Sequence, residues 1–318
     1  MSLPAFATGP RQTDEQYVQR VASYPFYQYA SRYWAAHLKD VGDLASQSAL
    51  QTQVLSFLGN RACVASSAQA LMRASGHGLA APTVMSPLSL VSYLDLPDLA
   101  SSLPPDDEQG SSLIHWSDSL GRTPLMWAAC GGSVLVVRLL LDRGSVRDYV
   151  DNVGEDALLL AIPQGHTNVV LELLEQGLPI EAPTTKSPLI RAAECGHRGI
   201  VQILLDQGAI PGSVLEHGET AMHNAAANGH LEVLEVLIHP AASWGFGLDH
   251  QNHEDETALF AAAFNGHAEP VKILLKIQDS VDKVTKVWCR SEKDFFSEVL
   301  QERGFPNLPS SPIHRQLL

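Results

Sequence analysis

The chain has 318 residues, of which 45% are hydrophobic and 18% charged, a composition typical of a folded protein rather than a disordered one. It carries 35 acidic and 21 basic residues, a formal net charge of −14, which argues against non-specific binding to nucleic acid or to an anionic membrane. The four cysteines form no CxxC pair, so neither a disulfide framework nor a structural zinc site is expected.

The first 75 residues divide into a flexible start and a helical region. Residues 1–12 have no basic flank followed by an apolar core, so no secretory signal is expected there. No apolar run reaches the roughly 18 residues that a membrane span needs, so we expect an intracellular protein, cytoplasmic or nuclear, that binds no membrane. Residues 13–75 offer three amphipathic helices, in "EQYVQRVASYPFYQYASRYWAAHLKD", "LASQSALQTQVLSFLGN" and "RACVASSAQALMRA".

Residues 76–111 are predicted to hold a degenerate copy of a repeat that follows them, and then a polar loop. The segment "SPLSLVSYLDLPDLASSL" places Ser86 at a helix-cap position and Asp95 where a glycine is expected. Ser86 precedes the next cap, Thr123, by 37 residues, so the phase is kept. The segment "SSLPPDDEQGSS" (101–112) has the composition of a loop.

Residues 112–283 contain one phrase five times, and we number these copies one to five. They are "RTPLMWAACGG", "EDALLLAIPQGH", "KSPLIRAAECGH", "ETAMHNAAANGH" and "ETALFAAAFNGH". Each runs nine residues from a capping residue to an anchor glycine, and these pairs are Thr123 and Gly132, Asp156 and Gly165, Ser187 and Gly196, Thr220 and Gly229, and Thr257 and Gly266. The copies are 33, 31, 33 and 37 residues apart, which indicates a stacked structural repeat rather than a catalytic loop.

Each copy predicts a short helix, a turn and a second helix. The capping side chain accepts a hydrogen bond from an orphan N–H group, and Pro124 and Pro188 follow at the first helical position, where a missing N–H costs nothing. Paired alanines such as Ala192 and Ala193 let neighbouring helices approach, and the anchor glycine closes the helix. Apolar spacing, as in "VLVVRLLLDRG", predicts the second helix, which ends at Gly144, Gly177 and Gly208 in the first three copies.

The phrase and its period resemble the ankyrin repeat, with its T-P-L-H-x-A-A-x-x-G-H pattern, over residues 112–283. The resemblance implies an all-α fold, a solenoid of five clear repeats and one degenerate repeat after a small helical region. Residues 284–303 are then expected to form a capping helix and residues 304–318 a flexible tail. The segment "PFYQYASRYWAAHL" is also similar to the region before the ankyrin array of fungal proteins with a NACHT nucleotide-binding module, but no GxxxxGK[ST] motif occurs, so no nucleotide binding is expected.

Copy two departs from the repeat pattern at two positions. Pro163 falls late in its first helix, where it removes one backbone hydrogen bond. Glu172 stands in its second helix at a position that is usually apolar. Copy two is therefore expected to be the weakest unit of the stack.

Histidines and cysteines are the candidates for chemistry, but their positions favour structural roles. Hydrogen bonds that brace the loops are expected from the four histidines that follow an anchor glycine: His166, His197, His230 and His267. His250 and His253 form an HxxH with no third ligand, so no metal site is expected. Cys130 and Cys195 are read as small, partly buried thiols, with a Cys–His nucleophile left as the alternative. No cofactor is expected.

The resemblance implies that partners contact the loop residues before each cap and the two residues before each anchor glycine. The candidate partner-binding residues are Arg122, Glu155, Lys186, Glu216, Glu219, Trp244, His253, Glu256, Phe264 and Asn265. Between Gly199 and Val271 there are ten acidic residues and no Lys or Arg, so a basic protein partner is expected, with a solubility coat as the alternative. Trp244, in a glycine-rich loop, either folds back or anchors the partner.

The leading hypothesis is a non-enzymatic interaction scaffold or regulator. The alternative is an enzyme or small-molecule binder, such as an accessory protein of a fungal biosynthetic pathway, with a pocket between the N-terminal helices and the first repeats. That pocket would be lined by aromatic residues that otherwise pack in the core: Tyr24, Phe26, Tyr29, Tyr33 and Trp34. A third reading is a regulator or decoy derived from a nucleotide-driven signalling protein. The sequence does not predict the oligomeric state.

Overall fold

The computed structural model describes residues 23, 27–41, 48–75, 82, 84–104, 112–180, 187–243 and 250–281. Over these residues the regular secondary structure is helical, without an extended strand, as the repeat pattern predicts. The predicted flexible N-terminus, capping helix and tail lie outside the described residues. The chain divides into two compact units, residues 1–178 and residues 179–318, and each is described by itself.

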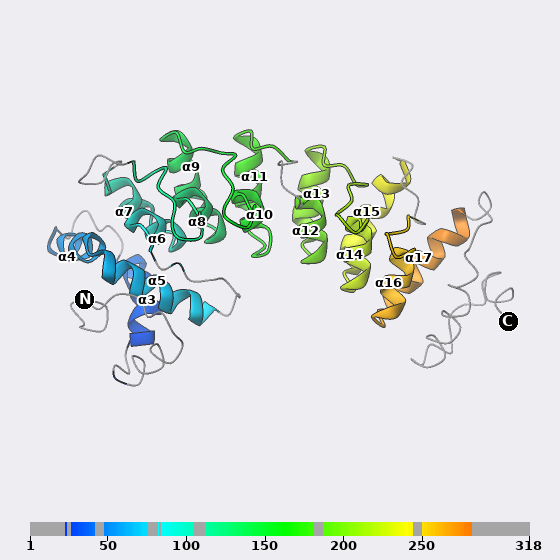
Figure 1. Ribbon diagram of the computed structural model, residues 1–318, viewed down its shortest axis with the longest axis horizontal. Helices are drawn as coiled ribbons and strands as arrows, with labels where there is room; N and C mark the ends of the chain where they lie inside the picture. The colour runs from blue at the N-terminus through cyan, green and yellow to red at the C-terminus, as the bar shows by residue number, and fades with distance from the viewer. Residues whose placement is uncertain are drawn as a thin grey trace. The chain divides into compact units, whose positions relative to one another are not determined.

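The repeats of the first unit form two rows of helices (Figure 1). The inner row stacks α6 (Pro87–Tyr93), α8 (Pro124–Cys130) and α10 (Ala157–Ala161), and the outer row stacks α7 (Pro97–Ser102), α9 (Val134–Asp142) and α11 (Thr167–Glu175). The core between the rows is apolar, and it includes Val137, Leu140 and Leu158, which have no solvent exposure. Helices α6 and α7 are the two helices of the degenerate copy.

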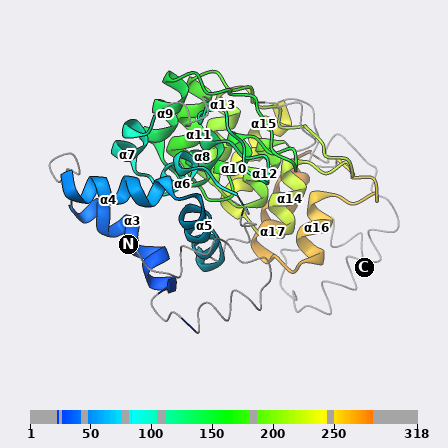
Figure 2. The ribbon, with the colours of Figure 1, turned by 60° about the vertical axis from the view of Figure 1, so that its left-hand side comes forward.

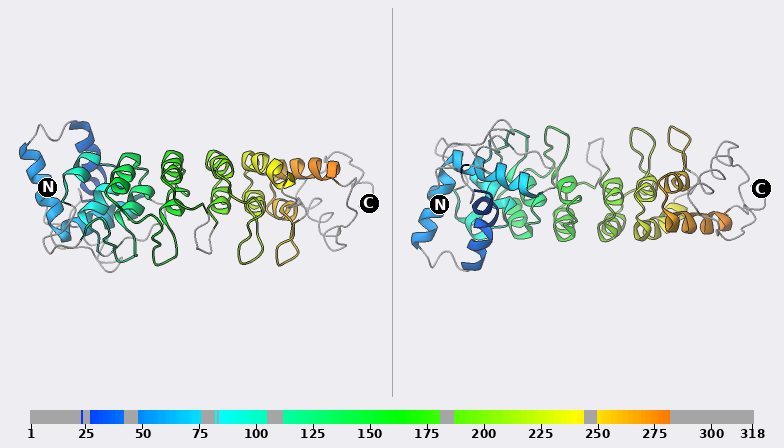
Figure 3. Two further views of the ribbon diagram at one scale, coloured as in Figure 1. Left: turned by 90° about the horizontal axis from the view of Figure 1, so that it is seen from above. Right: turned by 90° about the horizontal axis from the view of Figure 1, so that it is seen from below.

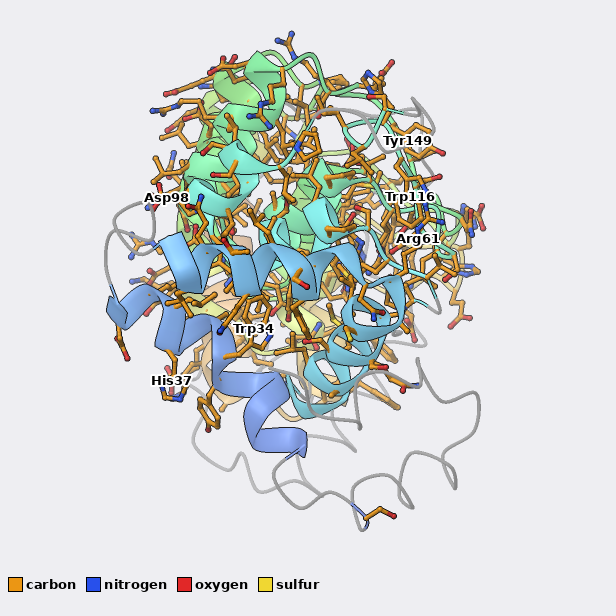
Figure 4. The ribbon with its side chains drawn as sticks, turned by 90° about the vertical axis from the view of Figure 1, so that its left-hand side faces the viewer. Trp34, His37, Arg61, Asp98, Trp116 and Tyr149 are labelled. Atoms are coloured by element: carbon orange, nitrogen blue, oxygen red, sulfur yellow. The ribbon has the colours of Figure 1, made fainter. Side chains whose placement is uncertain are left out.

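Three helices precede these repeats, and their own core lies among them. They are α3 (Tyr27–Val41), α4 (Ser48–Gly59) and α5 (Arg61–Ser75), of which α5 packs on α3, α4 and α6 (Figure 2). Trp34 of α3 is buried, its Nε1 donates to Ser67 Oγ over 3.1 Å, and its ring lies 5.6 Å from that of Phe57 (Figure 4). Trp34 is therefore a core residue of this small bundle, whereas Tyr33 is 40% exposed.

The second unit repeats the two-row arrangement. Its inner helices are α12 (Pro188–Glu194), α14 (Ala221–Ala227) and α16 (Ala258–Phe264), and its outer helices are α13 (Arg198–Asp206), α15 (Leu231–Ser243) and α17 (Ala268–Val281). Within each row every helix packs on the next, and the loops that precede α14 and α16 project on one side (Figure 3). Ala225, Ala226 and Ala262 are fully buried where the inner helices meet, as expected of small residues in this position.

The predicted helix caps are confirmed at four of the five copies. Thr123, Asp156, Thr220 and Thr257 each accept a hydrogen bond from the backbone N–H three residues later. Ser86 does the same for the degenerate copy. Ser187 occupies the cap position of α12, but its side chain makes no capping hydrogen bond.

The anchor glycines and the histidines after them form one recurring contact. The five anchor glycines have φ between 72° and 77°, a left-handed conformation that suits glycine. A Cβ placed on Gly229 would lie 2.7 Å from the ring of His267, so the ring also needs the glycine's lack of a side chain. Nε2 of His267 lies 3.0 Å from the carbonyl oxygen of Ala227, one copy earlier. Equivalent contacts join His166 to Cys130 and His230 to Glu194, which confirms the predicted bracing role for these three histidines.

Copy two carries both of its predicted departures. Helix α10 ends at Ala161, two residues before Pro163, and has five residues where α8, α12, α14 and α16 have seven. Glu172 is buried and accepts two hydrogen bonds from the guanidinium of Arg138, with 3.1 Å between Nε and Oε1. These hydrogen bonds lower the pKa of Glu172. The boundary between the two units follows this copy, at Leu178.

Candidate protein-binding surface

The residues that the repeat pattern assigns to partners are called the strip here. In each copy the strip consists of the residue before the cap and the two residues before the anchor glycine. These are Arg122, Cys130 and Gly131 in copy one, Glu155, Pro163 and Gln164 in copy two, Glu219, Ala227 and Asn228 in copy four, and Glu256, Phe264 and Asn265 in copy five; copy three has Lys186, Glu194 and Cys195. Because the inner helices of each unit stack in register, strip residues of neighbouring copies lie beside one another.

In the first unit the structure places Arg122 inside the protein. Its side chain is 9% exposed, its Nε donates to Asp151 Oδ2 over 3.0 Å, and its Nη2 lies 3.6 Å from Glu155 Oε2. The guanidinium carbon also lies 5.3 Å from the ring centre of Trp127. Arg122 and Glu155, both candidate partner residues, are thus joined by an ion pair within the loops of copies one and two.

Burial raises the pKa of two further groups near Arg122, the Asp118 carboxyl and the Cys130 thiol. The pKa of Asp118 is raised by burial, against the hydrogen bonds that it accepts from the backbone of Arg122, from Trp127 Nε1 at 2.8 Å and from the backbone of Leu120. Burial also raises the pKa of the Cys130 thiol to about 11, so this cysteine is protonated near neutral pH. A protonated thiol is a poor nucleophile, which favours the structural role for Cys130.

In copy five of the second unit two strip residues are exposed. Phe264 of α16 is 53% exposed, and its ring stacks with that of Phe260 with 6.1 Å between ring centres and 14° between ring planes. Asn265 is exposed beside it. The equivalent of Phe264 in copy one is Cys130, which is 3% exposed, so the same repeat position is buried in copy one and exposed in copy five.

The candidate partner-binding carboxylates of the second unit lie on the loops that lead into α14 and α16. Glu216 is exposed, whereas Glu219 and Glu256 are half-buried. Each of the half-buried pair is held by an amide: Asn224 Nδ2 donates to Glu219 over 3.3 Å and Asn252 Nδ2 donates to Glu256 over 3.1 Å. Their carboxylates are therefore oriented by neighbours.

Two neighbouring loops of the second unit are connected by their histidines. The backbone N–H of His253 donates to the carbonyl of His217 over 2.9 Å, and Nε2 of His250 lies 3.1 Å from the carbonyl oxygen of Gly218. The side chain of His253 is exposed. Among the described residues no group of three or more His, Cys, Asp or Glu side chains is arranged to hold a metal ion.

Several candidate residues lie outside the described residues: Lys186, Trp244, Tyr24 and Phe26. The side chain of Tyr29 is likewise not described.

Within the described part of the chain, no helix is both long enough and apolar enough to cross a membrane.

One exposed group was missed by sequence reasoning. The loop between copies one and two exposes Val146, Tyr149, Val150 and Val153 by 39–66%. Trp116, which lies 33 residues before Tyr149 and therefore at the equivalent place in the preceding loop, is on the same side of the unit (Figure 4). The sequence did contain a signal for this group: an aromatic residue recurs at the repeat period, as Trp116 and Tyr149, within two polar loops.

Comparison with known proteins shows that the chain is similar to ankyrin-repeat proteins. Residues 97–184 and 180–244 match the family described as ankyrin repeats in three copies. Ankyrin repeat domain-containing protein 63 of Homo sapiens is 34% identical over 149 residues, 44% of this chain and 38% of its own length. B-cell lymphoma 3 protein homolog of Mus musculus is 34% identical over 166 residues, 50% of this chain and 36% of its own length.

A third relative, neurogenic locus notch homolog protein 1 of Xenopus tropicalis, is 30% identical over 151 residues, 46% of this chain and 6% of its own length. The chain thus spans less than two fifths of the length of these relatives. The family match begins at residue 97, after the three N-terminal helices.

Proposed function

This chain is an ankyrin-repeat protein, and from that premise we propose that it is a non-enzymatic protein-binding module whose second unit holds a segment of a basic partner. Ankyrin repeats typically mediate protein–protein interactions. The observation that carries the proposal is Phe264 on the strip of copy five, which is 53% exposed and stacks on the half-buried ring of Phe260. Exposed aromatic residues among neutral and polar neighbours are the residue type that most often anchors an interface.

The charge around this aromatic pair defines the partner. No Lys or Arg occurs between residues 199 and 271, and Glu216, Glu219 and Glu256 lie on the loops beside the strip. A partner segment with Lys or Arg is therefore attracted, and an acidic segment is repelled. Charges at the rim mainly speed the encounter, whereas buried aromatic contacts slow dissociation.

Peptide selection on the folded chain tests both parts of the proposal. A random peptide library displayed on phage and selected against the wild-type chain should yield sequences that combine Lys or Arg with an apolar residue. Replacement of Phe264 by Ala should weaken these peptides by roughly 2 kcal/mol, mainly through faster dissociation. Reversal of Glu216, Glu219 and Glu256 to Lys should slow their association, and added salt should reduce that difference.

A matched variant separates binding from stability. Leu135 is 59% exposed on α9, in the first unit, so Leu135→Ala removes a similarly exposed apolar side chain away from the strip of copy five. It should leave peptide affinity unchanged. Selection of acidic peptides, or peptides bound equally by wild type and Phe264→Ala, would contradict the proposal.

A further inference from the structure

A cavity of about 520 Å³ opens between α3 and the first repeats. Ala35, Ala36 and Lys39 of α3 form one wall, and the end of the inner helix of the degenerate copy forms another through Tyr93, Leu94 and Asp95. Strip residues of copies one and two complete it, namely Cys130, Gly131 and Gln164, together with His166. Its volume lies within the range of roughly 300–1,000 Å³ typical of small-ligand pockets.

The repeat side of this cavity is built by close, directional contacts. A Cβ on Gly131 would lie 2.2 Å from the carbonyl oxygen of Tyr93, so only glycine allows the two backbones to approach there. Ser133 Oγ donates to the carbonyl of Ser92 over 2.7 Å, and Nε2 of His166 lies 3.1 Å from the carbonyl oxygen of Cys130. This side of the cavity is therefore held in shape before any ligand arrives.

The α3 side is joined to the repeats by one ion pair. Lys39 Nζ lies 3.0 Å from Asp95 Oδ2, and both side chains are almost half exposed. Asp95 stands at the anchor position, with φ of 54°, where copies one to five have glycine. Only a residue with a side chain can reach Lys39 from this position.

The side chains that line the cavity favour an uncharged ligand over a charged one. The charges of Lys39 and Asp95 neutralise each other at 3.0 Å, and the Cys130 thiol is neutral near pH 7. The two alanines and Leu94 supply apolar surface, and the Gln164 amide supplies a donor and an acceptor. We propose that this cavity is a binding site for an uncharged aromatic group that carries a hydrogen-bonding atom, either in a free small molecule or in a side chain of a partner protein.

Three matched probes test the charge preference: benzyl alcohol, benzylammonium and benzoate. Ligand-observed NMR titration of the full chain should show saturable binding of benzyl alcohol, at least about fivefold tighter than the charged probes, because each charged probe must lose hydration without a partner. Lys39→Gln leaves Asp95 without its cation and should shift the preference toward benzylammonium. Asp95→Asn, which tolerates the left-handed backbone, should shift it toward benzoate.

Filling the cavity tests its location. Ala36 is exposed on α3 and lines the cavity, so Ala36→Leu should weaken benzyl alcohol at least about fivefold, whereas Ala36→Ser, which leaves the volume almost unchanged, should not. Thermal melting of both variants checks that they fold. Absence of saturable binding by the wild type, preference of the wild type for a charged probe, or equal binding by Ala36→Leu would overturn the proposal.

Isolation of the chain from the cells that produce it shows whether the aromatic group belongs to a small molecule or to a partner protein. A non-covalent adduct of fixed mass in native mass spectrometry, present with the wild type and absent with Ala36→Leu, identifies a small molecule. A co-purifying protein that benzyl alcohol displaces, and that Ala36→Leu does not retain, identifies a side chain. Either result supports the site, and neither depends on the aromatic pair of the second unit.

Discussion

At the scale of single residues, some copies add hydrogen bonds of their own to the repeated helix cap. His223 is an example from copy four: the backbone N–H of Thr220 donates to its Nδ1 over 3.3 Å, so Nε2 carries the proton and donates to the carbonyl of Glu256, 3.1 Å away. Protonation of Nδ1 would break the first bond. Burial lowers the pKa of His223.

The lowered pKa of His223 predicts a pH-dependent stability. The unfolded chain takes up a proton near the ordinary histidine pKa of about 6.5, whereas the folded chain resists it, so stability is complete above about pH 6.5 and is lost as the pH falls toward the folded pKa. His223→Asn should remove up to about 1.4 kcal/mol per pH unit of this dependence. Urea unfolding of both chains near pH 7.5 and 5.5 measures it.

Exposed His217 provides the control for this experiment. His217→Asn should keep the wild-type difference between the two pH values. If His223→Asn and His217→Asn change the pH dependence equally, the buried ring of His223 is not its source.

The loop turns offer a stabilising change at Leu215. Asp118, Asp151 and Asn252 accept two backbone N–H groups each with Oδ1, at 2.8–3.0 Å. Leu215 occupies the same turn, with its N–H donating to the carbonyl of Glu219 over 3.0 Å, but has no acceptor in its side chain. Leu215→Asn should therefore raise the free energy of unfolding by about 1 kcal/mol.

Val214 is the matched site for this substitution, since it is exposed and precedes the turn. Val214→Asn should give no gain in the midpoint of chemical unfolding. A Leu215→Asn chain no more stable than the wild type would show that the turn gains nothing from the added acceptor.

At the scale of helices, the Arg138–Glu172 pair joins α9 to α11 at a position where other copies have Leu139 and Ile203. The Glu172 side chain is 6% exposed and that of Arg138 is 54% exposed. Among the described residues, loss of the arginine leaves a buried carboxylate with Gln176 as its remaining side-chain donor, so Arg138→Ala should cost about 1–3 kcal/mol. Glu172→Leu should stay within about 1 kcal/mol of the wild type, because an apolar side chain suits the site.

Chemical unfolding of the two variants decides between these expectations. We expect Arg138→Ala to be the less stable of the two. The reverse order would mean that the ion pair itself, rather than the burial of an unpaired carboxylate, dominates the energetics between α9 and α11.

How much the sequence predicts follows from the range of the interactions. Caps, anchor glycines and bracing histidines could be predicted because they depend on residues within one or two copies. The burial of Arg122 could not, because the repeat pattern assigns its position to partner contacts, and the ion pairs with Asp151 and Glu155 come from residues particular to this chain. The cavity could be expected only as a location, because its α3 wall comes from Ala35 and Ala36, whereas the buried Trp34 packs among the N-terminal helices.

At the scale of the whole molecule, the strip residues are exposed to different extents along the repeats. In copy one the strip residues Arg122 and Cys130 are buried, whereas in copy five Phe264 and Asn265 are exposed. The described strip residues of copies two and three are half-buried. The difference in exposure comes from the residues around each copy, because the copies share the same local repeat geometry. We therefore place the proposed partner surface in the second unit.

The most direct test of that assignment is amide hydrogen–deuterium exchange of the chain with and without a selected basic peptide. We expect slower exchange on binding in the loops that hold Glu216 and Glu256 and along α16, with α9 unchanged. Protection confined to the first unit, with α16 exchanging as in the free chain, would contradict it.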